Sequence, residues 1–224
     1  MMPRAGSGGL ALAAAALAAL TGVACGSKQP EIAALEWRLE SRPAEAGSDY
    51  ESLSVFATIR DDDGLDNILE LWVVNDDSAQ AWKLTDADWI KVGEGADTWI
   101  GASALATPEL AGMPRGPYRL VAIDAAGQRV EREFRVSGSF PDKKAPVAAF
   151  SGGRLSISSA WPETLALAFD GTGLLIASPG ASAQPSSLVD SFGPDLAART
   201  AEVGAYGYDP SLRMGAFSKR VRTR

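Results

Sequence analysis

The chain has 224 residues, of which 46% are hydrophobic and 22% are charged, a composition typical of globular proteins and too apolar for wholesale disorder. Its 28 acidic and 21 basic residues give a formal net charge of −7, which argues against non-specific nucleic-acid binding. It contains no histidine, and this excludes Ser-His-Asp and Cys-His nucleophiles, imidazole metal ligands and the commonest general base.

The N-terminus has the features of an export signal. Arg4 precedes an unbroken apolar run at 10–20, which resumes at Val23 and Ala24. This run is shorter than the ~20 residues needed to cross a bilayer, and a basic residue before a short apolar region is typical of a secretory signal peptide. We therefore expect residues 1–24 to be removed on export.

Cys25 is the one cysteine of the chain, and it ends the stretch Thr21-Gly22-Val23-Ala24-Cys25. Small residues before a cysteine at the cleavage point resemble the lipobox of bacterial lipoproteins, although Gly22 stands where that motif usually has a branched apolar residue. The resemblance implies that Cys25 is acylated, with chains such as palmitate, and becomes the first mature residue. The alternative is a secreted protein without a lipid, in which Cys25 is an exposed thiol.

A lipid on Cys25 would hold the mature chain on a membrane of the bacterial cell envelope, on its periplasmic or surface face. Residues 25–30 would form the lipidated cysteine and its tether, and the five residues after Cys25 reach at most ~17 Å. A single cysteine excludes an intrachain disulfide, so packed cores must stabilise the protein.

Residues 31–138 show the period-2 alternation of half-buried β-strands. Alternating stretches lie at 35–40, 52–60, 118–122 and 130–136, and a continuous apolar run lies at 68–74. Turns rich in Gly, Pro, Asn and Asp separate them, which favours a β-sandwich. Two residues break the pattern, because Phe56 falls on the polar side of its strand and Arg132 on the apolar side of its strand.

Two stretches of this region narrow the fold class. Residues 57–68 contain a strand, an acidic turn and a second strand, and residues 115–127 contain a strand and turn in which Tyr118 is placed as a tyrosine-corner residue. Together they resemble bacterial immunoglobulin-like and fibronectin type III-like modules. The resemblance implies an immunoglobulin-like β-sandwich over 31–138 and carries almost nothing about function, because such modules host many roles.

The rest of the chain predicts a linker at 139–146 and a smaller β-sandwich-like domain at 147–224, so the whole fold class is all-β. Strand-like pieces lie at 147–150, 155–157, 165–169 and 174–177, and a closing hairpin lies within 202–221. Residues 178–194, rich in Ser, Pro, Gly and Ala, predict a long loop. The alternative is that 147–224 is an extension packed on the first domain.

The acidic turn after residue 60 is a candidate metal site. Asp61, Asp63 and Asp66 offer the oxygen ligands that Ca²⁺ prefers, but acidic turns are also common connectors. An EF-hand loop is excluded, because Gly64 at its sixth position would make Ile59 the first ligand. We expect the turn to be structural and the protein to hold no metal or other cofactor.

Three tryptophans are candidate ligand-binding residues. Trp82, Trp89 and Trp99 lie in more polar surroundings than Trp72, which belongs to the apolar run. Exposed indole rings serve as stacking platforms for sugars, whereas a sandwich of this size usually buries one or two tryptophans in its core.

The sequence holds no G-x-S-x-G, S-x-x-K, P-loop or G-x-G-x-x-G motif, so we expect a protein that is not an enzyme. The function expected from all these features is a non-catalytic, lipid-anchored binding or scaffold module for another envelope protein or an extracellular ligand. The alternative is a carbohydrate-binding module that uses the exposed tryptophans.

The lipid anchor predicts that a palmitate analogue supplied to growing cells labels the chain and that Cys25→Ser abolishes the label, because Cys25 carries the only thiol. Gel fluorescence of the purified chains measures this. Equal labelling of the two chains would contradict the anchor.

Overall fold

The computed structural model describes residues 28–45, 48–109 and 112–223, so the predicted signal peptide and Cys25 lie outside the described residues. Within those ranges the chain is mostly β-structure arranged in packed sheets, which confirms the all-β, sandwich-like fold class. No helix of the described part is long and apolar enough to span a membrane.

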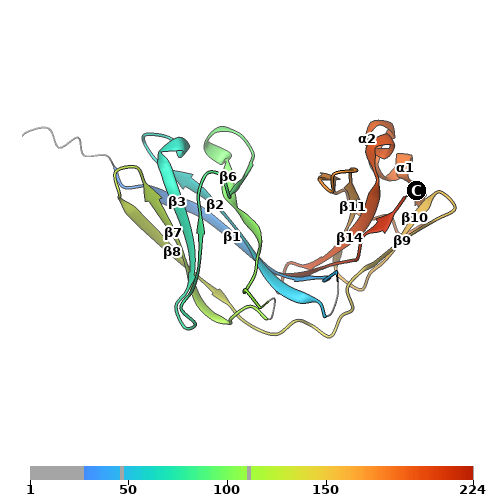
Figure 1. The fold of residues 1–224 in the computed structure, drawn as a ribbon, viewed down its shortest axis with the longest axis horizontal. Helices are drawn as coiled ribbons and strands as arrows, with labels where there is room; N and C mark the ends of the chain where they lie inside the picture. The colour runs from blue at the N-terminus through green and yellow to red at the C-terminus, as the bar shows by residue number, and fades with distance from the viewer. Residues whose placement is uncertain (1–27, 46–47, 110–111, 224) are drawn as a thin grey trace, which may run out of the picture.

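The N-terminal half is a sandwich of two layers (Figure 1). One layer has the order β1-β2-β6-β5, with β1 at Glu31–Arg42, β2 at Tyr50–Arg60, β6 at Trp99–Leu105 and β5 at Ile90–Val92. The other has the order β4-β3-β7-β8, with β4 at Gln80–Leu84, β3 at Ile68–Asn75, β7 at Gly116–Asp124 and β8 at Arg129–Val136. Single 3-10 turns lie at Leu65–Asn67 and Gly95–Asp97. Alternate residues of both layers fill the core, including Leu39, Leu53, Val55, Leu71, Val73 and Leu120.

Two side chains inside the sandwich explain particular features of the sequence. The fully buried Tyr118 donates its hydroxyl to the Pro114 carbonyl, four residues upstream, at 2.8 Å. Burial raises the pKa of Tyr118 to about 12. Arg132 interrupts an apolar face because its Nη1 donates to the carbonyls of Ile32 and Ala33, at 3.1 and 3.0 Å, where the register of β1 against β2 is irregular.

The C-terminal half adds a second small core. A three-stranded sheet has the order β13-β10-β9, with β13 at Ser186–Ser187, β10 at Arg154–Ser158 and β9 at Val147–Ser151. It packs with α1 (Leu188–Phe192) against the strands β11 (Glu163–Phe169) and β14 (Glu202–Asp209), and α2 spans Pro194–Arg199. The core between them contains Ala148, Leu155, Ala166, Ala168, Phe192, Val203 and Ala205.

The loop expected at 178–194 is partly wrong, because β13 and α1 form within it. The signal for α1 is a capping box: Ser187 Oγ accepts from the backbone N–H of Asp190 at 3.1 Å, and the Asp190 carboxylate accepts from the N–H of Ser187 at 3.3 Å. Pro194 then begins α2, where its missing N–H is tolerated.

One sheet runs through both halves of the molecule. Strand β15 (Met214–Phe217) pairs in parallel with β1, aligning Leu39 with Met214 and Glu40 with Gly215. The nine-stranded sheet therefore has the order β12-β11-β14-β15-β1-β2-β6-β5, where β12 spans Leu175–Ala177 and β16 (Val221–Arg222) also pairs with β14. We call it the shared sheet, and in Figure 1 it bridges the two halves.

Residues 139–146, predicted to be a linker, contain no helix or strand and are held against the C-terminal half. Lys143 Nζ lies 3.0 Å from Asp209 Oδ2, and Trp161 Nε1 donates to the Lys144 carbonyl at 3.0 Å. Trp161 belongs to the same core cluster as the sandwich. The junction between the halves is therefore packed and hydrogen-bonded as well as joined by backbone pairing.

Two glycines let aromatic rings lie on both faces of the junction. A Cβ on Gly207 of β14 would collide with the Trp161 side chain, and a Cβ on Gly215 of β15 would collide with the ring and hydroxyl of Tyr206. Because neighbouring residues on a strand point to opposite faces, Gly207 opens the core side and Gly215 the opposite side. The Tyr206 ring can consequently reach across β15 toward β1.

Candidate binding cleft

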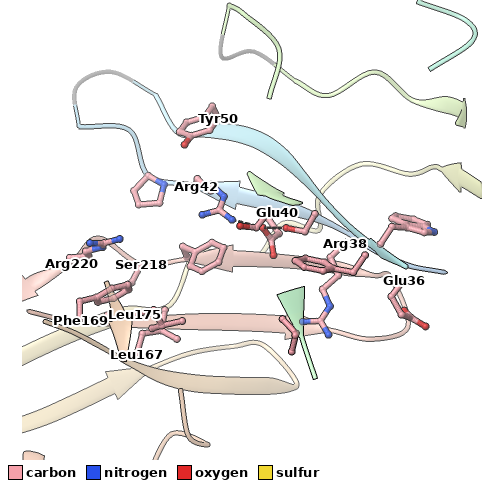
Figure 2. A pocket seen from close by; sticks show the side chains of 18 of the residues that line it. Glu36, Arg38, Glu40, Arg42, Tyr50, Leu167, Phe169, Leu175, Ser218 and Arg220 are labelled. Atoms are coloured by element: carbon pink, nitrogen blue, oxygen red, sulfur yellow. Dashed lines mark hydrogen bonds and ion pairs between the residues drawn. The ribbon is translucent and has the colours of Figure 1, made fainter. Parts of the chain in front are cut away.

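The shared sheet has one face that points away from both cores, and this face is hollowed into a cleft of about 820 Å³ (Figure 2). The strands of both halves line it. The sandwich contributes all but one of the charged side chains of the lining together with several aromatic ones, and the C-terminal half contributes mainly apolar side chains. The lining comprises Glu36, Trp37, Arg38, Glu40, Arg42, Pro43, Tyr50, Ser54, Phe56, Val92, Trp99, Ser103, Leu167, Phe169, Leu175, Gly204, Phe217, Ser218 and Arg220.

The sandwich wall of the cleft follows from strand alternation. The period that buries Leu39 in the core turns the even-numbered residues of β1, from Glu36 to Arg42, to the opposite face. The β1–β2 register places Phe56 beside Glu36 and Ser54 beside Arg38. Phe56 therefore faces the cleft, which accounts for an aromatic residue on the polar side of its strand.

The C-terminal wall is a small apolar cluster on the same face of the sheet. Leu167, Phe169 and Tyr206 are buried there, and Leu165, Tyr208 and Phe217 pack against them. The ring centroids of Tyr206 and Phe217, which are cross-strand partners, lie 4.5 Å apart. Sequence patterning identifies the closing hairpin but not this wall, because nothing in the sequence shows that β15 pairs with β1.

A buried carboxylate lies where the two walls meet. The Glu40 side chain is 7% exposed, and its Oε2 accepts from Arg42 Nη2 at 2.7 Å and from Ser54 Oγ at 2.9 Å. Its Oε1 accepts from the Tyr206 hydroxyl at 3.3 Å. Arg42 Nε donates in turn to Ser52 Oγ at 2.8 Å. The network joins β1 and β2 of the sandwich to β14 of the C-terminal half.

Tyr206 is held as a hydrogen-bond donor in this network. Burial, with the negative charge of Glu40 nearby, raises the pKa of its hydroxyl far above the usual range. The hydroxyl therefore stays protonated at any physiological pH. A buried carboxylate needs such donors, because an uncompensated buried charge costs several kcal/mol.

Three arginines lie over aromatic rings of the C-terminal wall. The guanidinium carbon of Arg42 is 4.3 Å from the Phe217 centroid, that of Arg38 is 4.6 Å from Tyr208, and that of Arg220 is 3.7 Å from Phe169. Such stacking combines cation–π attraction with cover for apolar surface. The guanidinium groups thus cover the aromatic wall from the solvent side.

The charges of the cleft are paired, with one exception. Glu40 pairs with Arg42, Glu36 lies 3.3 Å from Arg213, and Arg220 lies 3.7 Å from Glu202. In the described residues no carboxylate lies within 4 Å of the Arg38 guanidinium, although Arg38 is exposed on the floor of the cleft. Arg38, which lies beside the rings of Tyr206 and Tyr208, is therefore the cation of the cleft that has no carboxylate partner in the described part of the chain.

The three predicted tryptophans do not form one platform. Trp89 is 8% exposed and belongs to the sandwich core, so the expectation that its ring is exposed is wrong. Trp82 packs partly buried against the same core, and its Nε1 donates to the Ala106 carbonyl at 3.0 Å. Trp99 lines the cleft on β6. The three rings differ in exposure because each packs differently in the fold, and the polarity of their neighbours in the sequence does not predict this packing.

Two carboxylates of the acidic turn already have partners in the described residues. Asp61 accepts from the N–H of Asp63 at 2.9 Å and from Asn67 Nδ2 at 3.1 Å. Asp66 lies 3.4 Å from Lys91, so its counter-charge comes from a distant strand. Among the described residues no three His, Cys, Asp or Glu converge on a point that could hold a metal. The two hydrogen bonds of Asp61 stabilise the turn itself.

No protein-family model and no curated protein matches the chain. Among solved structures it is similar to Tp47, the 47-kilodalton lipoprotein of Treponema pallidum, with a TM-score of 0.44 and 16% identity over 85% of this chain and 50% of that one. It is also similar to dimeric latent PorU of Porphyromonas gingivalis, with a TM-score of 0.35 and 13% identity over 90% of this chain and 20% of that one. The chain thus spans about half of the first and a fifth of the second, and neither similarity assigns it a function.

The buried network predicts different effects of two acids on the same face of β1. Glu40→Gln removes the charge that Arg42, Ser54 and Tyr206 satisfy, so we expect it to destabilise the fold by about 2–3 kcal/mol. That corresponds to a drop in melting temperature of roughly 4–12 °C for a chain of this size. Calorimetry or circular dichroism measures it.

Glu36→Gln is the matched control, because the Glu36 side chain is 57% exposed and forms one surface ion pair, worth at most about 1 kcal/mol. A melting temperature that falls no further for Glu40→Gln than for Glu36→Gln would show that the network does not hold the halves together.

Proposed function

We propose that the protein is a non-catalytic, lipid-anchored protein of the bacterial cell envelope that binds a partner in the cleft. The observation that carries the proposal is the cleft itself, to which both halves contribute a wall. Soluble monomers rarely leave a large, partly apolar hollow without a use. The strand order of the sandwich and the Tyr118 corner support an immunoglobulin-like class for it.

The chemistry of the cleft supports binding over catalysis. Glu40 already accepts from three donors, and Glu36 is paired with Arg213. The chain also lacks histidine. Neither carboxylate of the cleft is placed as a free general base or nucleophile, and the remaining side chains there are suited to recognition.

The start of the chain supports an arrangement that holds the cleft off the membrane. Lys28 lies 3.5 Å from Asp62, and Gln29 donates to the Arg129 carbonyl, so the first described residues lie at one end of the sandwich. Strand β1 begins there and is 12 residues long, which spans roughly 35–40 Å. With Cys25 in a bilayer, β1 would carry the cleft outward, toward partners in the envelope.

Carbohydrate binding is the competing proposal, and Trp99 in the cleft supports it. An array of envelope and host glycans, probed with the wild-type chain and with Trp99→Ala, distinguishes the two. If the wild-type chain binds glycans and Trp99→Ala does not, the ligand of the cleft is a sugar and not a protein.

Photo-crosslinking in cells of the source bacterium tests the cleft as the binding site. A photoreactive amino acid replaces Val92 or Leu175, which line opposite sides of the cleft and are 54% and 47% exposed. We expect both positions to give the same adduct. The matched control is Leu69, which is 51% exposed on β3 of the other sandwich layer.

Adducts of equal yield from Leu69, or none from either side of the cleft, would contradict a binding role for the cleft.

A further inference from the structure

We propose that the ligand of the cleft is an acidic, amphipathic polypeptide segment, with apolar side chains on the C-terminal wall and a carboxylate on Arg38. This inference rests on the proposed function and names the ligand class for the same site. It follows from the different exposed side chains on the two sides of the cleft, the one cation there without a carboxylate partner among the described residues, and the two edges of the shared sheet.

The walls require a ligand with two different sides. On the C-terminal side Leu175 is 47% exposed and Phe217 is partly exposed, while Arg38 and Ser103 present exposed polar side chains on the sandwich side. Figure 2 places Arg38 and Glu36 away from Phe169 and Leu175. A wholly polar ligand would leave the apolar side chains in contact with water. A wholly apolar ligand would bury the charge of Arg38 without a partner, at a large cost in free energy.

The charges select an acidic ligand. The other cations of the cleft, Arg42 and Arg220, have carboxylate partners, so Arg38 remains for the ligand. Its guanidinium is stacked on Tyr208, which holds the planar fork in place for a carboxylate. Residues 31–138 hold 10 basic and 21 acidic residues, so an acidic ligand is attracted at this contact and repelled by much of the surrounding surface.

The edges of the sheet favour a polypeptide over a small amphiphile. The shared sheet ends at β5 on one side and at β12 on the other. Ile90 and Val92 of β5 are 45% and 54% exposed, and Leu174 and Leu175 at β12 are 62% and 47% exposed. An edge strand offers unpaired N–H and C=O groups to another chain, and a peptide can pair there while its side chains enter the cleft.

Selection from a random peptide library tests this with a defined probe. The full chain, purified as the expressing bacterium produces it, is the bait for displayed 12-residue peptides, and fluorescence anisotropy measures the affinity of the enriched sequences. We expect enrichment of Asp or Glu beside bulky apolar residues. Sodium laurate and phospholipid vesicles are added as competitors, to test whether a lipid occupies the cleft. Neither should displace the bound peptides.

Variants on opposite faces locate the contact. We expect Arg38→Glu and Leu175→Asp each to weaken binding at least tenfold, and the matched changes Arg135→Glu and Leu69→Asp, at exposed positions of the other sandwich layer, to change it less than twofold. Replacing the acidic residue of the peptide with lysine should restore binding to Arg38→Glu, which shows that this variant is folded.

Enriched peptides without acids, no enrichment, equal loss in the control variants, or displacement by laurate would each overturn the acidic-peptide proposal. If cleft-specific crosslinks are still found, the binding function stands without it. If the crosslinks are not specific to the cleft, the proposed function itself fails.

Discussion

The parallel pairing of β1 with β15 brings Leu39 beside Met214 and makes one sheet of two halves. Because the side chains of a strand alternate between faces, this register also decides which residues of the C-terminal half face the cleft. Gly215 falls opposite Glu40, so Tyr206 can cross β15 and reach the carboxylate. A shift by one residue would send the aromatic wall to the other face, and the cleft would not exist.

The buried Glu40 network is consistent with this role for the register. A buried ion pair contributes little net stability, because desolvation offsets much of the attraction. It does require a specific geometry, because donors from three strands, Arg42, Ser54 and Tyr206, must all lie within hydrogen-bond distance of Glu40. We interpret the network as a device that selects one arrangement of the halves. The contacts of Lys143 and Trp161 reinforce it from the opposite face.

The sequence predicts the strands and their inner faces, because alternation records burial directly. It places Leu39, Leu53, Val55 and Tyr118 on the inner faces of their strands, where the structure buries them. It does not predict the cleft, because alternation shows which residues share a face and not which strand lies alongside. The one sequence feature that points to the cleft is Phe56, an aromatic side chain on the otherwise polar face of its strand. Trp89 is misleading for a related reason, since its polar neighbours lie in turns while its ring enters the core.

We infer that the two halves form one rigid body, with the cleft already shaped before a ligand binds. Electron–electron distance measurement tests it most directly, with spin labels at Val92 and Leu175, across the cleft, in a Cys25→Ser chain without ligand. A pre-formed cleft predicts one narrow distance distribution that persists in Glu36→Gln and broadens in Glu40→Gln. A broad or multiple distribution in the chain with Glu40 intact would contradict the claim, because the halves would then move independently.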